Sequence, residues 1–443
     1  MKVLVACAEC EADVRAWLQS PGQGKVLKEN RLRSVHLWKG LCVKRFKNPG
    51  LGRAVRGRLL DPARAEYRLL LELRSRGLDV PEPVAWARLG RETVVFTREI
   101  ADAVPLRVLP MNRDRLRALA RLVRRAYDVG LRHDDLHVGN VLEGAGRLWL
   151  VDLQEARLKR ALSEEERAAS AAFLTMSFYE SVSRTETLRF WRAVGVDPAR
   201  VWPAFRALRH RYWAGRRARV RRSGSDFEVV DGLVLRRPFT AEEARRVFTA
   251  PPFKRVKELP NRRLWLADAG TFVKEGAGEA WSNAYGLEIR SIPTPRMKAK
   301  ADGRIAGEWL EGALPLWDHL KAHGVSRPLL ERLARIVRRM HQRGVYHRDL
   351  KANNVLVRGQ DAWIIDLDRV DFRLELTREQ RVFNLAQLNA AVGPPATRSD
   401  RLRFFFVYAA LEPSILRDWK SWVREIMDRT RARKHHWPER EGR

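Results

Sequence analysis

The sequence predicts an α+β fold made of two consecutive, similar domains, each with a small β-rich lobe followed by a mostly helical lobe. A chain of 443 residues is longer than one hydrophobic core usually serves, which favours two domains. The two halves also repeat each other: residues 119–153 and 333–367, which lie 214 positions apart, are identical at 16 of 35 aligned positions. These observations place the domains at residues 1–222 and 223–443, joined near the polar segment 223–226.

Each expected element follows from a hydropathy period and a local stop signal. Alternating apolar and polar side chains predict half-buried strands at 32–46 and 262–274, with short strands at 148–151 and 363–365. Amphipathic stretches that end at glycine or before proline predict helices at 63–76, 113–129, 280–290 and 329–343. Capping boxes at Ser163 and Thr377 predict that a further helix begins there in each half.

Basic residues greatly outnumber acidic ones. The chain has 86 lysines and arginines against 54 aspartates and glutamates, so its formal net charge is +32. Such an excess favours anionic partners, such as a nucleic acid, a phosphorylated glycan or an acidic lipid surface, and argues against a polycationic substrate. The apolar fraction of 45% and the charged fraction of 32% exclude a wholly disordered chain.

The three cysteines, Cys7, Cys10 and Cys42, are too few to hold a fold of this size together by disulfides. They therefore indicate a reducing compartment. Cys7 and Cys10 form a single C-x-x-C without a second pair, which leaves a zinc or redox role as the minor alternative. No apolar run approaches the ~18 residues of a membrane span, so we expect a cytoplasmic protein.

The strongest functional signal is a motif that occurs once in each half. Residues 347–354 read HRDLKANN, and an apolar strand that follows them ends at Asp366. Residues 133–140 read HDDLHVGN, and Asp152 stands at the corresponding strand end. An H-x-D-L-x-x-x-N loop followed by a strand-terminal aspartate is the signature of the protein-kinase-like catalytic core.

Phosphoryl transfer explains these residue types. A loop aspartate orients the acceptor hydroxyl and takes its proton, while an amide oxygen and a strand-end carboxylate hold Mg²⁺ against the phosphates of ATP. The predicted catalytic residues are Asp135 and Asp349. The predicted metal ligands are Asn140, Asp152, Asn354 and Asp366.

A kinase-like lobe also needs a strand lysine for the α- and β-phosphates and a helix carboxylate to pair with that lysine. Lys44 with Glu66 fits these positions in the first half. Lys274 fits in the second half with Glu279 as its predicted partner, although Glu275 and Glu288 compete on spacing.

Further residues of the loop have expected roles. His137 and Lys351, two residues past the catalytic aspartates, are predicted to reach the γ-phosphate. His133 and His347 are expected to brace the loop rather than to exchange protons. Segments 96–100 and 308–312 stand where the hinge between two lobes would bind adenine through backbone groups.

Several parts of a conventional protein kinase are missing. No G-x-G-x-x-G precedes Lys44 or Lys274, and the triplets that begin at Asp152 and Asp366 lack the glycine of DFG. Only 11 residues separate Asp152 from Ser163, which leaves no room for a regulated activation segment. These features favour an atypical kinase for a small substrate or a glycan.

The sequence resembles the bacterial lipopolysaccharide core kinases, the Kdo and heptose kinase group. The resemblance is carried by residues 347–351, 365–370, 292–295 and 403–405, and it covers nearly the whole second half and, more loosely, the first. It implies a protein-kinase-like fold, with ATP and Mg²⁺ as cofactors. It also implies phosphorylation of a sugar hydroxyl on lipid A–core at the cytoplasmic face of the inner membrane. Typical members look like one such domain, so the tandem arrangement departs from the family pattern.

Charge patterning suggests how such a protein would meet its substrate. Residues 201–222 contain eight arginines and no acidic residue, interleaved with aromatic residues, and 416–434 is a weaker counterpart. We expect these basic helices to contact an anionic glycolipid, the lipopolysaccharide core, at the periphery of the inner membrane. Binding of nucleic acid by the same stretches is the less favoured alternative.

Two alternatives to this function stay open at this point. One is a RIO-like kinase that acts on a protein or a ribonucleoprotein. The other is a pseudokinase scaffold in one half that supports a single active domain. Both halves keep the lysine, the two aspartates and the asparagine, so the sequence does not decide between one active domain and two.

Overall fold

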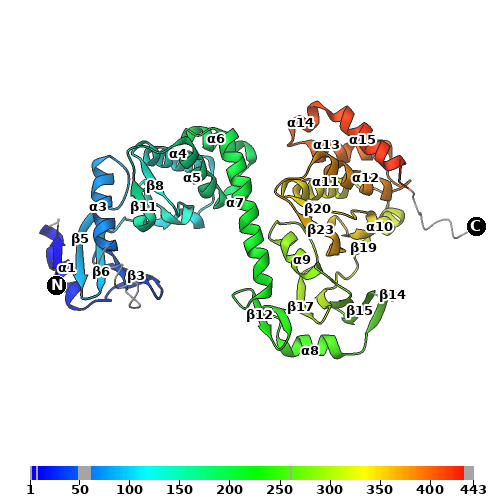
Figure 1. Ribbon diagram of the computed structural model, residues 1–443, viewed down its shortest axis with the longest axis horizontal. Coiled ribbons are helices and arrows are strands. Elements are labelled where there is room, and N and C mark those ends of the chain that lie inside the picture. The colour runs from blue at the N-terminus through cyan, green and yellow to red at the C-terminus, as the bar shows by residue number, and fades with distance from the viewer. Residues whose placement is uncertain (1, 6–7, 48–60, 260–261, 434–443) are drawn as a thin grey trace, which may run out of the picture. The chain divides into compact units, whose positions relative to one another are not determined.

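The chain folds into two compact units, Met1–Arg209 and His210–Arg443 (Figure 1). The computed structural model describes residues 2–5, 8–47, 61–259 and 262–433. Each unit begins with an antiparallel sheet and continues into a mostly helical lobe, so the predicted α+β class is confirmed.

The division between the units falls inside helix α7 (Pro198–Ala218), upstream of the predicted boundary between residues 222 and 223. The last turns of α7 belong to the second unit because Arg216 donates a hydrogen bond of 2.9 Å to the hydroxyl of Tyr285 there. The polar segment 223–226 is a loop that leads into the first strand of the second unit.

The sheet of the first unit has six strands in the order β1-β5-β6-β4-β3-β2, all antiparallel. Its strands are β1 (Lys2–Val5), β2 (Lys25–Glu29), β3 (Arg33–Trp38), β4 (Leu41–Phe46), β5 (Pro83–Leu89) and β6 (Glu92–Arg98). Helices α1 (Glu11–Gln19) and α3 (Pro62–Ser75) accompany the sheet, and α3 begins where Asp61 accepts a hydrogen bond from the backbone of Arg64. Trp17 of α1 is fully buried against Phe96 of β6.

The helical lobe of the first unit packs around a separate apolar core. Its helices are α4 (Arg113–Asp128), α5 (Glu164–Met176), α6 (Arg184–Val194) and the first half of α7. The short strands are β7 (Val104–Pro105), β8 (Leu131–His133), β9 (Val141–Gly144), β10 (Arg147–Leu150) and β11 (Ala156–Leu158). The capping box predicted at Ser163 is present at the start of α5.

The sheet of the second unit has seven strands in the order β12-β13-β17-β18-β16-β15-β14. Its last five strands follow the same order as β5-β6-β4-β3-β2 of the first unit. The strands are β12 (Phe227–Val230), β13 (Leu233–Arg236), β14 (Lys254–Leu259), β15 (Arg262–Asp268), β16 (Thr271–Glu275), β17 (Met297–Ala301) and β18 (Arg304–Glu308). Helices α8 (Ala241–Thr249) and α9 (Ala280–Glu288) accompany them.

The helical lobe of the second unit resembles that of the first in its element order. Its helices are α10 (Leu316–His323), α11 (Arg327–Gln342), α12 (Arg378–Ala391), α13 (Arg398–Ala409), α14 (Pro413–Arg417) and α15 (Trp419–Arg431). Its short strands are β19 (Leu314–Pro315), β20 (Val345–His347), β21 (Val355–Arg358), β22 (Asp361–Ile364) and β23 (Val370–Phe372). The capping box predicted at Thr377 opens α12. Among the described residues, none of the helices combines the length and the apolar character needed to cross a membrane.

Helices α11, α12 and α13 meet at a buried histidine. The Nδ1 atom of His341 lies 2.8 Å from the hydroxyl of Tyr408, and its Nε2 atom lies 3.3 Å from Oδ1 of Asn384. Burial lowers the pKa of His341 to about 3, because a charged imidazolium would lose its hydration there. The ring is therefore neutral at physiological pH.

Acidification should destabilise the second unit through His341. As the pH falls below about 6.5, His341 becomes protonated in the unfolded chain. In the folded chain it stays neutral until the pH approaches its lowered pKa of about 3. This group alone lowers the free energy of unfolding by ~1.4 kcal/mol per pH unit in that window. Urea-induced unfolding measured from about pH 7 to 5 should show a shallower pH slope in His341→Gln, whose amide does not titrate. Equal slopes in the two proteins would contradict the prediction.

Candidate functional site

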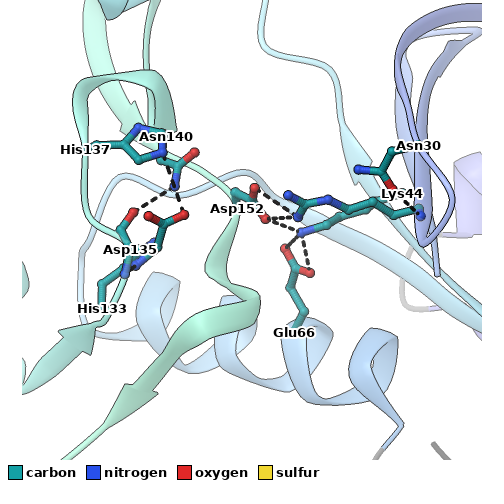
Figure 2. Close-up of polar contacts among 9 residues, drawn as sticks. Asn30, Lys44, Glu66, His133, Asp135, His137, Asn140 and Asp152 are labelled. Carbon is teal, nitrogen blue, oxygen red and sulfur yellow. Dashed lines mark hydrogen bonds and ion pairs between the residues drawn. The ribbon is translucent and has the colours of Figure 1, made fainter. Parts of the chain in front are cut away.

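In the first unit the side chains of Lys44, Glu66 and Asp152, which come from three different parts of the fold, meet (Figure 2). Lys44 lies on the central strand β4, and its Nζ atom is 3.0 Å and 2.9 Å from the two carboxylate oxygens of Glu66 on α3. The same Nζ atom lies 2.7 Å from Oδ1 of Asp152, which follows β10. Lys44 and Glu66 are both buried, so the ion pair is shielded from solvent. The predicted pairing of Lys44 with Glu66 is therefore present.

Asp152 is held in an unusual backbone conformation. Its φ angle is +60°, in the left-handed region that non-glycine residues rarely adopt. The backbone N–H of Val151 donates to the carbonyl of Asn140 at 2.9 Å and so ties this turn to the H-x-D loop. Arg33 of β3 donates to both carboxylate oxygens of Asp152, at 3.0 Å and 3.1 Å. Burial alone would raise the pKa of Asp152, but the charges of Lys44 and Arg33 lower it below its ordinary value.

The H-x-D loop of the first unit is folded back on itself. The Nδ2 atom of Asn140 donates to the backbone carbonyl of Asp135 at 3.0 Å, and the backbone N–H of Asp135 donates to Nδ1 of His133 at 3.2 Å. His137 accepts a hydrogen bond from the backbone of Gly139 at 3.0 Å, and its Nε2 atom lies 3.7 Å from the carboxylate of Asp135 (Figure 2). The loop thus places His137 beside the predicted catalytic residue.

The second unit contains a cavity of about 600 Å³ between its sheet and its helical lobe. The cavity is lined by the predicted residues Lys274, Asp349, Lys351, Asn354 and Asp366, and also by Asp368. The Nζ atom of Lys274 lies 3.2 Å from Oδ1 of Asp366 and 2.6 Å from Oδ2 of Asp368. The structure therefore gathers the predicted lysine, loop aspartate, asparagine and strand-end aspartate into one pocket.

The loop of the second unit repeats the contacts of the first and adds to them. Asn354 donates to the carbonyl of Asp349 at 2.8 Å and to its carboxylate at 3.2 Å. Lys351 lies 2.8 Å from Oδ2 of Asp349. The φ angle of Asp366 is +58°, matching that of Asp152. After Asp366 the chain returns at once as β23, which pairs with β20 so that Val370 lies opposite His347.

His347 connects the loop to the strand end. Its Nε2 atom lies 3.0 Å from the carbonyl of Ile365, and its Nδ1 atom accepts a hydrogen bond from the backbone of Asp349 at 3.2 Å. Burial lowers the pKa of His347, so the ring stays neutral with its proton on Nε2. These contacts are those of a bracing residue.

The prediction that Glu279 pairs with Lys274 is wrong. Glu279 does not contact Lys274; it accepts a hydrogen bond of 2.5 Å from Ser282 and lies 3.5 Å from Arg221. The competing residues do not reach the lysine either, because Glu275 lies 3.6 Å from Arg263 and Glu288 pairs with Arg236. Helix α9 begins with the uncharged Ala280 at the place that corresponds to Glu66, and Asp368 supplies the second carboxylate instead.

Two amide side chains on α12 were not predicted and hold the loop of the second unit. Asn384 donates to the carbonyl of His347 at 2.5 Å. Gln387 accepts from the backbone of Leu350 at 3.0 Å and donates to the carbonyl of Arg348 at 2.9 Å. Both are fully buried, and two amides on the apolar face of a helix were the signal that could have identified them.

The segments expected to bind adenine make the same backbone contact in both units. The backbone N–H of Glu99 donates to the carbonyl of Gly40 at 2.8 Å, and that of Trp309 donates to the carbonyl of Gly270 at 3.1 Å. In the second unit Trp309 and Leu310 line the cavity. Adenine binding by segments 96–100 and 308–312 stays a prediction.

The basic stretch 201–222 is less exposed than its charge suggests. Phe205 and Trp213 are buried, and Arg209 is buried between Phe205 and Tyr179. Exposed basic residues remain at Arg211, Arg219, Arg221 and Arg222, and on the second stretch at Arg417, Lys420, Arg424 and Arg431.

Of the C-x-x-C pair, Cys10 is buried at the start of α1 and Cys7 lies outside the described residues.

The oxygen donors of each unit fit a hard cation. Each unit offers one asparagine amide oxygen and one or two carboxylates, the ligand type that Mg²⁺ prefers together with substrate phosphates. Within the described ranges, His, Cys, Asp and Glu side chains do not cluster in threes as an all-protein metal cage would need. The donor sets therefore suit a metal that is shared with a nucleotide.

Comparison with known proteins identifies the family. The sequence profile of the lipopolysaccharide kinase (Kdo/WaaP) family matches residues 16–193 and 296–408, more than half of the chain. The chain belongs to this family.

Individual relatives match part of the chain. The 3-deoxy-D-manno-octulosonic acid kinase of Xanthomonas campestris pv. campestris (strain B100) is 35% identical over 112 residues, which are 23% of this chain and 44% of that protein. The protein of the same name from Vibrio cholerae serotype O1 is 26% identical over 124 residues, 23% of this chain and 52% of that one. The chain thus spans about half the length of these curated relatives. A solved structure, WaaP in complex with acyl carrier protein, is 27% identical, with a TM-score of 0.36 over 45% of this chain and 98% of that one.

Removing the amide of Gln387 should loosen the loop of the second unit. Gln387→Met keeps the side-chain length but leaves the backbone N–H of Leu350 and the carbonyl of Arg348 without these partners. We expect the free energy of unfolding to fall by ~1–3 kcal/mol. Amide hydrogen exchange of residues 347–351 should become faster. Gln360→Met, at an exposed turn, is the matched control and should change neither quantity. Unchanged exchange in Gln387→Met would refute the role of the amide.

Proposed function

We propose that this chain is an ATP-dependent phosphotransferase that phosphorylates a sugar hydroxyl of lipopolysaccharide core or of a related cell-envelope glycolipid. One observation carries the proposal. In both units a sheet lysine is ion-paired with a strand-end aspartate, beside a loop aspartate that is tied to an asparagine. Membership of the lipopolysaccharide kinase family supports the same chemistry.

In this proposal Asp135 and Asp349 orient the acceptor hydroxyl and take its proton. The acceptor oxygen forms a bond to the γ-phosphorus while the bond from that phosphorus to ADP breaks. Lys44 and Lys274 hold the α- and β-phosphates. When bound, Mg²⁺ neutralises charge on the phosphates, and its proposed protein ligands are Asn140, Asp152, Asn354 and Asp366.

Lys351 and His137 have a further proposed role beside the loop aspartates. The Nζ atom of Lys351 is 2.8 Å from Asp349, and Nε2 of His137 is 3.7 Å from Asp135. A cation at this place would contact the γ-phosphoryl group as its oxygens gain charge. The shorter contact with the loop aspartate favours Lys351 over His137 for this role.

The proposed acceptor is an anionic glycolipid. The named relatives are kinases of 3-deoxy-D-manno-octulosonic acid, an acidic sugar, and the net charge of +32 favours an anionic partner. We place the protein in the cytoplasm, at the periphery of the inner membrane. The exposed arginines of 211–222 and the basic residues of α15 would contact the lipid surface there, at ~1 kcal/mol for each basic residue near an acidic membrane.

Two aspartate substitutions test the proposal. The full chain is incubated with γ-labelled ATP, Mg²⁺ and purified lipid A–core, and mass spectrometry follows the gain of one phosphate group. Asp349→Ala should lower the turnover of the second unit by about 10²- to 10⁴-fold because the general base is lost, and Asp135→Ala should do the same to the first unit. The turnover lost in each variant is then the share of that unit.

The controls for this assay are Asp361→Ala and Asp114→Ala, which remove exposed carboxylates of the second and first units. Both should leave turnover unchanged. If neither Asp135→Ala nor Asp349→Ala changes turnover, the catalytic assignment is wrong. If wild-type protein phosphorylates a ribonucleoprotein but no glycolipid, the substrate class is wrong.

One observation favours a second candidate function for the first unit, as a nucleotide-binding unit that supports an active second unit. Arg33 occupies both carboxylate oxygens of Asp152 and therefore competes with Mg²⁺ for this ligand. The equivalent Asp366 lies 3.2 Å from Lys274, which also pairs with Asp368.

Arg33→Gln should strengthen metal binding in the first unit if this competition holds. An acyl-phosphate derivative of ATP transfers its acyl group to a lysine amine beside the phosphates, so mass spectrometry can read Lys44 and Lys274 separately in one chain. We expect the Mg²⁺ concentration for half-maximal labelling of Lys44 to fall about tenfold, which is ~1.4 kcal/mol. The Mg²⁺ concentration for half-maximal labelling of Lys274 should not change. An unaltered Mg²⁺ requirement at Lys44 would exclude the competition.

A further inference from the structure

The two units hold their sheet lysines with carboxylates from different places in the chain. In the first unit the partners of Lys44 are Asp152 and Glu66 of α3. In the second unit the partners of Lys274 are Asp366 and Asp368, two residues further along. We infer that Asp368 positions Lys274 for nucleotide binding and so takes the part that Glu66 takes in the first unit. This inference rests on the proposed function, because it concerns the same nucleotide site.

The helix of the second unit has no carboxylate at the required place. Helices α3 and α9 end alike: Leu78 donates to the carbonyl of Leu73, and Ile292 donates to the carbonyl of Leu287, each at 3.0 Å. These pairs are 214 positions apart, the same offset that relates the two H-x-D loops. Counting back along the helices at this offset sets Ala280 opposite Glu66. Ala280 is buried and lines the cavity, but its methyl group cannot bind an amine.

The missing carboxylate reappears after the strand. At the same offset Asp368 stands opposite Gln154, so each unit has one carboxylate and one uncharged residue at these two places. Gln154 is exposed, whereas the side chain of Asp368 is only 12% exposed. Each lysine is therefore paired with two carboxylates, and the second one lies on the helix in the first unit but in the turn after the strand in the second.

Lys274 depends on its pairing with Asp368 because its side chain is largely removed from water. The side chain of Lys274 is 18% exposed, and an amine that is largely removed from water needs ionic partners. Its contact with Asp368 is 2.6 Å, against 3.2 Å to Asp366. Asp366 is also the proposed metal ligand, so it cannot serve the lysine alone once a nucleotide is bound. Asp368 is left to fix the flexible lysine stem.

The experiment reads each lysine in the full chain with the acyl-phosphate derivative of ATP and unmodified ATP as competitor. In Asp368→Asn, which keeps the shape of the side chain, the ATP concentration that halves labelling of Lys274 should rise about tenfold. Labelling of Lys44 and its competition by ATP should not change. Asp361→Asn, an exposed carboxylate of the same lobe, is the matched control and should leave both lysines unaffected.

A transposed pair separates positioning from general packing. Asp368→Gln combined with Ala280→Glu recreates the arrangement of the first unit, with the carboxylate on the helix. We expect this double variant to recover ATP competition at Lys274 to within about threefold of wild type, whereas Asp368→Gln alone does not. Recovery would support positioning, because it returns the charge without returning the original side chain.

The outcomes distinguish the inference from the proposed function. If wild-type protein shows no ATP-competed labelling of either lysine, the proposed function fails. If wild type is labelled and Asp368→Asn competes normally at Lys274, the inference alone is overturned. It is also overturned if Asp368→Asn and the transposed pair lose labelling of Lys274 to the same extent. This outcome counts only if the labelling of Lys44 and the circular dichroism spectrum are those of wild type.

Discussion

The ion pair between a largely buried sheet lysine and the aspartate at a strand end is the interaction on which each unit depends. It joins the sheet to the helical lobe, since Lys44 and Lys274 lie on central strands while Asp152 and Asp366 follow β10 and β22. Each charge offsets part of the cost of removing the other from water. The residues that surround the pair, such as Glu66 in one unit and Asp368 in the other, complete its charge balance.

This ion pair is maintained by backbone that is held under constraint. Both aspartates adopt the left-handed conformation, which costs free energy for a residue with a side chain. In each unit a hydrogen bond from the residue before the aspartate to the loop asparagine carbonyl holds the turn. In the second unit His347, Asn384 and Gln387 add neutral hydrogen bonds to the same loop. The loop is thus fixed mainly by groups that carry no charge.

The fold class and the helix starts follow from the sequence because each has a local signal, a hydropathy period or a capping box. Glu66 was predicted as the partner of Lys44 because it stands near the start of the helix that follows the strand. The partner of Lys274 could not be found in this way. The offset between the halves is 230 at the lysines and 214 at the loops, so the distance in sequence from the lysine to the helix differs between the halves. The second carboxylate of Lys274 also lies outside the helix. Asn384 and Gln387 act on a loop that is distant in sequence, which only the tertiary structure reveals. In 201–222 the charge pattern predicted an exposed basic surface, but the aromatic residues Phe205 and Trp213 of this stretch are buried.

The return of the chain as β23 immediately after Asp366 has a consequence for control. In the second unit the segment that follows the strand-end aspartate is paired with β20, next to the loop itself, and is therefore ordered as soon as the lobe folds. Nothing in this stretch needs a covalent signal to become organised. Under the proposed function, this segment is not the place where individual molecules are switched on and off. Turnover would then follow the supply of acceptor and the number of copies that the cell makes.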